Sequence, residues 1–206
     1  MNNHRKGLML VLSSPSGAGK TTLCKKIIDS DKEILMSVSA TTRPKRKSEK
    51  NAKDYFFLNE EDFNLKKKSG YFVETAKVFD FYYGTPKDFI EDNLSKGIDI
   101  IFDLDWQGTQ KLSDYSKNDL VSIFILPPST KVLKQRLKKR AEDSDEIVSK
   151  RMSKAKSEIS HWVEYDYVLI NDNLEKCLYA IQNIIKAERL KRFRQKNIYD
   201  IVEKLI

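Results

Sequence analysis

A serine- and glycine-rich segment near the start of the chain has the residue types needed to bind phosphate groups. It consists of Ser13, Ser14, Pro15, Ser16, Gly17, Ala18, Gly19, Lys20, Thr21 and Thr22. Successive backbone N–H groups in such a loop wrap a phosphate at the positive end of the following helix. Gly17 and Gly19 permit the close approach, Lys20 can reach the β- and γ-phosphates, and the Thr21 hydroxyl suits Mg²⁺. The segment predicts a nucleoside triphosphate site that uses Mg²⁺ as cofactor.

The sequence around this segment favours a P-loop over an ordinary surface loop with a lysine. Residues 8–12 form an apolar run typical of a strand buried on both faces, and a helical pattern follows the loop. Ser14 stands where the usual motif has its first glycine, but strand, loop, Gly-Lys-Thr and helix occur in the required order. The loop does not name the phosphate acceptor.

The rest of the chain predicts a parallel α/β sheet flanked by helices. Further buried-strand patterns lie at residues 98–104, 120–126 and 167–170, and helical patterns at residues 87–96 and 129–140. One apolar stripe marks a C-terminal helix and contains Cys177, Leu178, Ile181, Ile184 and Ile185. Strands separated by helices favour parallel pairing because parallel neighbours require crossover connections.

Two segments depart from this alternation of strand and helix patterns, and they predict additions to a single folding unit. Residues 37–85 contain short strand patterns at 37–40, 55–58 and 71–78 around one helix at 60–69, typical of a small mixed lobe. Residues 129–160 are strongly charged and predict two projecting helices joined by an acidic turn at 142–146. We therefore expect a core of residues 1–36, 86–127 and 154–206, a lobe of residues 37–85 and a lid of residues 128–153.

Two carboxylates end the predicted strand at residues 98–104. Asp103 and Asp105 are two residues apart, a spacing that points both side chains to the same face of the strand. Ligands of parallel sheets bind beyond such carboxyl ends, although surface turns also carry aspartates. We expect Asp103 to support Mg²⁺ through water and Asp105 to face a bound base.

Several further motifs occur in a fixed order along the chain. They are Ser37 to Arg46, Asp54-Tyr55-Phe56-Phe57, Phe72-Val73-Glu74, Tyr82-Tyr83-Gly84-Thr85 and Asp103-Leu104-Asp105-Trp106-Gln107-Gly108. Together with the P-loop they resemble the guanylate kinase family, over residues 7–194. The resemblance implies a P-loop NTPase fold with a monophosphate-binding lobe and a helical lid. It also implies an ATP:GMP phosphotransferase of purine nucleotide metabolism.

The resemblance also implies roles for individual residues. The ATP-binding set is Ser14, Pro15, Ser16, Gly17, Ala18, Gly19, Lys20, Thr21, Thr22 and Asn171. The GMP-binding set is Ser39, Arg43, Arg46, Tyr55, Glu74, Tyr83, Gly84, Thr85, Asp103 and Asp105. The phosphoryl-transfer set is Lys20, Arg43 and the lid arginines Arg136, Arg140 and Arg151. Thr21 and Asp103 are the expected Mg²⁺ residues.

The chain departs from the family pattern at two places. In the arginine loop the proline, Pro44, comes one residue early, and Ser48 and Ala52 replace glycines. In the lid the usual Arg-Gly step is Arg140-Ala141. These differences concern loop conformation, because the residues implied to bind phosphate and base are present.

The chemistry of two acceptor residues agrees with these implied roles. Arg43 and Arg46 supply planar forks suited to a dianionic phosphate. The Glu74 carboxylate can accept hydrogen bonds from the N1–H and 2-amino groups of guanine, which adenine lacks. A lone glutamate on an edge strand would more often face Lys77 or water. Its place among the other motifs favours the guanine site.

Composition limits the remaining possibilities. The chain has 206 residues, a formal net charge of +8 and 33% charged residues, which favours one globular unit. No apolar run approaches the ~20 residues that span a bilayer, so we expect a cytoplasmic protein without membrane contact. Cys24 and Cys177 fall on predicted helix faces and are expected to be packed thiols. No element interleaves basic and aromatic residues, so we expect nucleotides and no nucleic acid as partners; the oligomeric state stays open.

Three hypotheses remain at this point. The first is an active guanylate kinase, the second a catalytically silent guanylate-kinase-like interaction module, and the third a P-loop kinase for another nucleoside monophosphate. Silent modules generally lack an intact P-loop, whereas this chain has Gly17, Gly19, Lys20 and Thr21. An assay that offers different acceptors separates all three.

Overall fold

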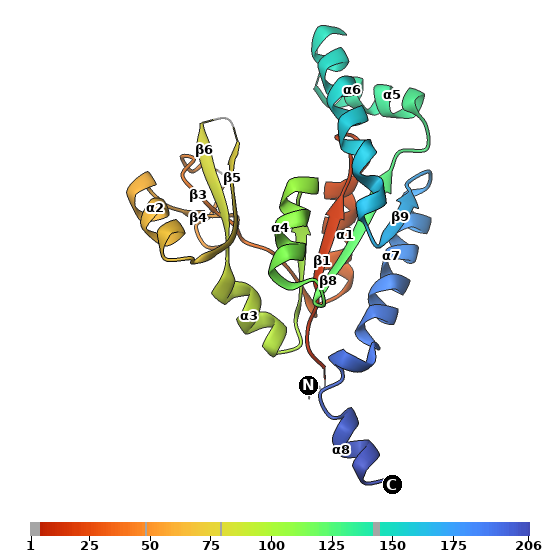
Figure 1. Ribbon diagram of the computed structural model, residues 1–206. Helices are drawn as coiled ribbons and strands as arrows, with labels where there is room; N and C mark the ends of the chain where they lie inside the picture. The colour runs from red at the N-terminus through yellow and green to blue at the C-terminus, as the bar shows by residue number, and fades with distance from the viewer. Residues whose placement is uncertain (1–4, 48, 79, 142–144) are drawn as a thin grey trace.

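The fold consists of a parallel sheet with helices on both faces, a smaller sheet beside it, and two helices above one end (Figure 1). This computed structural model describes residues 5–47, 49–78, 80–141 and 145–206. The predicted α/β class is confirmed.

The larger sheet is built around β1 (Met9–Ser13), which is buried along its whole length. Its strand order is β2-β7-β1-β8-β9 and all pairs are parallel. The other strands are β2 (Ile34–Met36), β7 (Asp99–Asp103), β8 (Leu120–Leu126) and β9 (Tyr167–Ile170). After β1 the chain forms β2 and β7 on one side of it, and then β8 and β9 on the other side. The carboxyl ends of β7 and β1 therefore border a crevice suited to a ligand.

Side chains alternate across β1 and create two separate cores. Leu10 and Leu12 pack with α1 (Lys20–Ser30) and α7 (Leu174–Arg189) on one face. Met9 and Val11 pack with α3 (Lys87–Ser95) and α4 (Trp106–Ser116) on the other face. Both faces of the sheet are therefore covered, which explains the continuous apolar run in the sequence.

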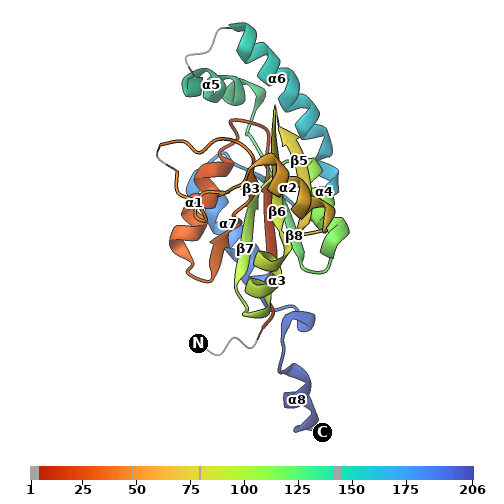
Figure 2. The same cartoon turned by 90° about the vertical axis from the view of Figure 1, so that its left-hand side faces the viewer.

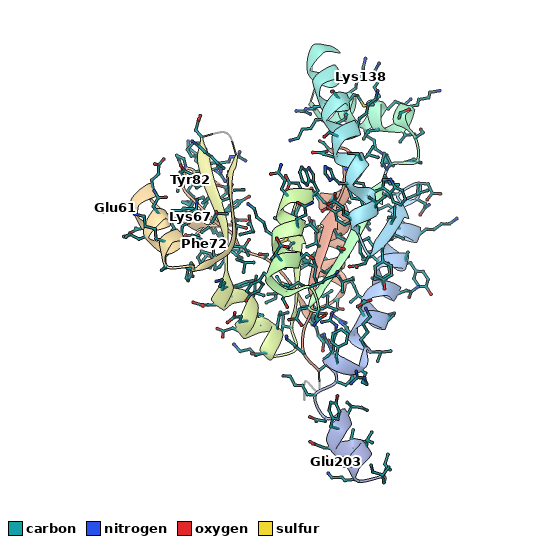
Figure 3. The ribbon with its side chains drawn as sticks, in the orientation of Figure 1. Glu61, Lys67, Phe72, Tyr82, Lys138 and Glu203 are labelled. Atoms are coloured by element: carbon teal, nitrogen blue, oxygen red, sulfur yellow. The ribbon has the colours of Figure 1, made fainter. Side chains whose placement is uncertain are left out.

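The smaller sheet lies to one side of α4 and has the order β4-β3-β6-β5 (Figures 1 and 2). Its elements are β3 (Ala40–Thr41), β4 (Phe56–Phe57), α2 (Glu60–Lys68), β5 (Phe72–Val78) and β6 (Phe81–Pro86). Phe63 of α2 stacks on Phe72 and Tyr82, with ring centroids 4.7 and 5.6 Å away (Figure 3). A side chain at Gly84 would place its Cβ 2.9 Å from the Phe72 ring, so this tight aromatic core requires glycine there.

Two helices, α5 (Thr130–Ala141) and α6 (Asp145–Ile159), project above the core sheet and lead into a 3₁₀ helix at Ser160–Glu164 (Figure 2). Leu133 and Leu137 pack against Ala155 between the two helices. Asp145 and Glu146, which were predicted to lie in the acidic turn, belong to α6, and the other residues of that predicted turn, 142–144, lie outside the described part of the chain. The predicted lid boundary at residue 153 falls inside α6.

The sequence patterns located the long elements better than the short ones. The strand at residues 120–126 and that at 167–170 have the predicted bounds, and the helices near 87–96 and 129–140 are confirmed within one residue or two. The patterns missed β2, β6, α4 and the C-terminal α8 (Ile198–Glu203). The three-residue β2 has a single buried side chain, so it shows no periodicity, and the predicted strand at 37–40 is reduced to Ala40–Thr41.

Both cysteines are buried and unpaired, as predicted. Burial raises the pKa of the Cys24 thiol to about 12 and that of the Cys177 thiol to about 11. In the residues that the structure describes, no helix is long and apolar enough to cross a membrane.

Charged side chains gather at the amino ends of the core strands, opposite the P-loop. Asp99, fully buried at the start of β7, accepts a hydrogen bond from the backbone N–H of Leu8 and pairs with Arg5 and Arg189. Arg194 is 1% exposed and donates to the carbonyls of Gly7 (3.3 Å) and Asn118 (3.1 Å). This network ties the segments before β1 and after α7 to the sheet.

Arg194→Ala should lower the free energy of unfolding by about 3 kcal/mol, because it removes a buried donor from the carbonyls of Gly7 and Asn118 and a buried positive charge beside Asp119 and Glu188. Arg192→Ala, in the same 3₁₀ segment but exposed, should change it by less than about 1 kcal/mol. Urea unfolding followed by circular dichroism measures both. Equal effects of the two variants would contradict the structural role of Arg194.

Candidate active site

The P-loop lines a cavity of about 550 Å³ at the carboxyl end of β1. The lining residues are Ser14, Pro15, Ser16, Gly17, Gly19, Lys20, Thr21, Thr22, Asp105, Arg136 and Glu158. Gly17 and Gly19 have φ angles of 89° and 101°, a region that side chains disfavour. The loop therefore needs both glycines to turn its backbone N–H groups towards the cavity. Of the residues expected to bind ATP, Ala18 is fully buried and does not line it.

The floor of the loop is fixed by an amide and a guanidinium from other elements. Asn171, which is 3% exposed, donates from Nδ2 to the Ala18 carbonyl at 2.7 Å. Arg136 of α5 donates to the carbonyls of Ala18 (3.4 Å) and Asn171 (3.2 Å). A Cβ at Gly19 would lie 2.5 Å from the Asn171 amide nitrogen. Asn171 thus supports the loop, a contact that the sequence analysis did not predict.

Lys20 extends from the start of α1 towards the end of β7. Its ammonium nitrogen lies 2.5 Å from Asp103 Oδ1 and donates to the Leu104 carbonyl at 3.1 Å. The neighbouring strands β1 and β7 pair in parallel, which brings these two ends together. The P-loop lysine and the carboxylate expected near Mg²⁺ are therefore in direct contact.

The position of Asp105 differs from the one expected from the sequence. Strand β7 ends at Asp103, so the alternation of side chains along a strand does not extend to Asp105, and the predicted shared strand face is wrong. Asp105 is the N-cap of α4, and its carboxylate accepts a hydrogen bond from the Gly108 N–H at 3.0 Å. It still lines the cavity, but on the helix that follows the strand.

Arg43 is held in the loop that follows β3. Its guanidinium donates to the Glu49 carboxylate at 2.7 Å and to the Pro44 carbonyl at 2.8 Å. The Glu49 carboxylate also accepts from the Arg46 backbone N–H at 2.8 Å, while the Arg46 side chain is exposed. The hydrogen bond to Glu49 raises the pKa of Arg43, and the same bond lowers the pKa of Glu49. One carboxylate therefore occupies the donors of an arginine expected to bind phosphate.

Two tyrosine rings of the lobe pack beside this loop. The Arg43 guanidinium lies 5.4 Å from the centre of the Tyr55 ring, and the Tyr55 and Tyr83 rings meet edge to face at 6.0 Å. Burial raises the pKa of Tyr55, and Tyr83, Glu49 and Asp103 raise it further, while Arg43 lowers it. The Arg43 guanidinium and the two tyrosine rings therefore form one cluster on the lobe.

Glu74 lies on β5 and is only 7% exposed. It accepts a hydrogen bond from the Thr85 hydroxyl at 2.9 Å across the β5–β6 pair. Burial raises the pKa of Glu74; the Thr85 hydrogen bond and the Lys111 charge lower it, and the Asp105 charge raises it. Ser39 lies just before β3, half-buried, and accepts from the Phe56 N–H through its carbonyl. A protected carboxylate of this kind can discriminate between ligands by their hydrogen-bond donors.

The remaining expected residues divide between the described and undescribed parts of the chain. Arg151 lies half-buried on α6, and Gly84 packs against Phe72 in the lobe core. The side chain of Arg140 and the whole of Ser48 lie outside the described residues. Ala52 adopts a φ of 59° with its side chain present, so the loop keeps the turn for which the family pattern has glycine.

Three residues that the sequence analysis did not assign contact the site. Glu158 of α6 accepts a hydrogen bond from the Ser16 N–H of the P-loop at 3.2 Å. Glu49 accepts a hydrogen bond from Arg43, and Lys111 of α4 donates to the backbone carbonyl of Thr75, next to Glu74. Glu158 is seven residues after Arg151, a spacing that shares one helix face, so this periodicity could have indicated it.

A P-loop on a parallel sheet, facing a second lobe with its own arginine and tyrosine cluster, defines the class of P-loop nucleoside monophosphate kinases. Within this class the chain belongs to the guanylate kinase family, whose family model, described as guanylate kinase, matches residues 6–188. The predicted family is confirmed.

Individual relatives agree along nearly the whole chain. A guanylate kinase of Paramagnetospirillum magneticum is 52% identical over 201 residues, which cover 98% of this chain and 94% of the relative. One of Novosphingobium aromaticivorans is 49% identical, with 98% and 92% covered. The crystal structure of guanylate kinase from Anaplasma phagocytophilum aligns with a TM-score of 0.76 at 39% identity, covering 97% of this chain and 95% of that one.

Glu158→Gln should tighten the binding of ATP about two- to fivefold, because a carboxylate at the mouth of the P-loop repels phosphate. Calorimetric titration with ATP at low salt measures the change. Glu203→Gln removes the same charge from the exposed α8 and serves as the control (Figure 3). Unchanged or weaker ATP binding by Glu158→Gln alone would contradict the repulsion.

Proposed function

We propose that this protein is an active guanylate kinase, which transfers the γ-phosphoryl group of ATP to GMP and yields ADP and GDP. The observation that carries the proposal is the position of α4: Asp105, which caps this helix, lines the P-loop cavity, and the helix packs against β5, the strand of the buried Glu74. One helix therefore joins the P-loop cavity to the strand that holds the carboxylate expected to read the base. The family membership of the chain supports the same activity.

The donor ATP binds with its phosphates in the P-loop cavity. Backbone N–H groups around Gly17 and Gly19 surround the phosphates, and Lys20 exchanges Asp103 for the phosphate oxygens. Arg136 enters the same cavity from the lid. In our proposal Asn171 supports the P-loop and does not contact the nucleotide, because its buried amide donates to the Ala18 carbonyl.

The acceptor GMP binds in the lobe. Its phosphate is held by Arg43, Arg46 and the hydroxyls of Tyr55 and Tyr83, with Glu49 leaving the arginine as the phosphate arrives. Its guanine meets the Glu74 carboxylate, which accepts from N1–H and the 2-amino group. Thr85 orients Glu74. Ser39 and Asp105, which come from other elements, complete the binding site for the base.

The reaction needs alignment and positive charge more than covalent help. A phosphate oxygen of GMP attacks the γ-phosphorus of ATP, the bond to the β–γ bridging oxygen breaks, and ADP leaves with the electron pair. The GMP phosphate is already a competent nucleophile, so we assign no general base. Lys20, Arg43 and Arg136 neutralise the migrating group, and the lid arginines Arg140 and Arg151 complete this set when α5 and α6 close.

The residues around the P-loop fit Mg²⁺. Thr21 contributes a hydroxyl to the cavity and Asp103 a carboxylate beside Lys20, and Mg²⁺ prefers such oxygen ligands together with nucleotide phosphates and water. Within the described residues no group of three or more His, Cys, Asp or Glu could hold a metal by itself. When bound, Mg²⁺ neutralises charge on the transferred phosphates, and Thr21 with Asp103 would orient it.

We expect the purified protein to phosphorylate GMP with ATP and Mg²⁺, and to act on AMP, CMP and UMP at least ~10³-fold less efficiently by kcat/KM, because those bases leave Glu74 unpaired. A coupled spectrophotometric assay measures ADP formation with each acceptor. Lys20→Ala should lose nearly all activity while its circular dichroism spectrum stays unchanged. Turnover of no acceptor would favour an interaction module, and a preference for AMP or CMP another kinase.

Glu74→Gln should raise the KM for GMP by about 10²-fold, since the amide presents one acceptor and one donor where guanine offers two donors. The KM for ATP should stay within about twofold. Steady-state kinetics with each substrate varied in turn measures both constants. Glu61→Gln, on the exposed start of α2, is the matched control (Figure 3). A GMP preference that survives in Glu74→Gln would remove the assignment of base recognition to this residue.

A further inference from the structure

Helix α4 lies between the core sheet and the lobe, and it touches both (Figure 1). Its first turn is capped by Asp105, and Leu112 is buried in the core against β1 and β7. Gln110 is hydrogen-bonded to Glu164 below the lid at 2.8 Å. The helix is therefore fixed to the core, and its opposite side packs against β5 of the lobe.

One side chain crosses from α4 to the lobe. The Lys111 ammonium donates to the backbone carbonyl of Thr75 at 2.5 Å. Thr75 directly follows Glu74 on β5, and both residues pair with β6, at Gly84 and Thr85. The carbonyl that Lys111 binds thus belongs to the strand segment that holds the buried carboxylate.

The Lys111 charge also acts on Glu74 itself. Burial disfavours the ionised carboxylate, and the Asp105 charge adds to this effect. The Thr85 hydroxyl of β6 and the Lys111 ammonium of α4 oppose it. Lys111 is therefore the positive charge that offsets Asp105 near this carboxylate.

We infer that Lys111 is a positioning residue for guanine recognition: it holds the strand of Glu74 at a set distance from the helix of Asp105, and keeps Glu74 ready as an acceptor. The inference deepens the proposed function and rests on it. Glu74 lies on β5 of the smaller sheet and Asp105 at the start of α4 beside the larger sheet, so a base read by both needs a connection between these elements. Lys111 makes that connection through one hydrogen bond and one charge.

The test is calorimetric binding of GMP and, separately, of ATP to the full-length wild type, Lys111→Met and Lys111→Arg. We expect Lys111→Met to weaken GMP about three- to tenfold, the loss of one hydrogen bond from a charged donor, with ATP binding unchanged. Lys111→Arg should recover most of the GMP affinity. Lys117→Met, at the exposed end of the same helix, is the control and should bind GMP as the wild type does.

The pH dependence of GMP binding separates this role from simple attachment of the lobe. GMP binding requires ionised Glu74, so affinity falls as the pH drops through the pKa of this group. Removal of the Lys111 charge raises that pKa further, so the fall in Lys111→Met should begin at a higher pH than in the wild type and Lys111→Arg. Titration of the GMP phosphate is common to all proteins and cancels in the comparison.

The outcomes distinguish this inference from the proposed function. GMP affinity of Lys111→Met equal to the wild type, an equal loss of ATP and GMP binding, or an unshifted acid limb would each overturn the inference. Because binding is measured directly, the result does not depend on turnover. A wild type that binds GMP but transfers no phosphate would overturn the proposed function alone.

Discussion

The ion pair between Lys20 and Asp103 marks the position at which groups from the two sheets have to act together on the substrates. It forms because β1 and β7 are parallel neighbours, so the P-loop that follows one strand lies next to the carboxylate that ends the other. The Asp103 charge also contributes to the raised pKa of Tyr55, which directly precedes β4 of the smaller sheet. A phosphoryl group can be transferred only between substrates in contact, so an acceptor held by the lobe has to reach this end of the core sheet.

Carboxylates occupy the anion-binding groups throughout the site. Asp103 pairs with Lys20, Glu49 with Arg43, and Glu158 accepts from the P-loop N–H of Ser16. Each of these carboxylates accepts from a donor that would otherwise be unpaired until phosphate binds. Substrate binding is then an exchange of one anion for another, so its net free energy is a difference between two favourable states.

Much of the site could be predicted because its chemistry depends on local patterns. Gly17, Gly19 and Lys20 follow a buried strand and begin a helix, and the backbone requirements of a phosphate loop are local. Asp105 was placed near the site, but the shared strand face was wrong because the strand stops two residues earlier and a helix cap takes over. Glu158 and Lys111 were missed since their partners are 142 and 36 residues away in the chain.

The sequence by itself determined the parallel α/β class, the phosphate loop, the inserted lobe and the family, because buried strands, glycines and ordered motifs carry these signals along the chain. Only the tertiary structure decided which charges meet: Lys20 with Asp103, Arg43 with Glu49, and Lys111 with the strand of Glu74. The reason is physical. Coulombic and hydrogen-bond energies depend on distance and burial, and distance between elements is a property of the fold that local residue patterns do not contain.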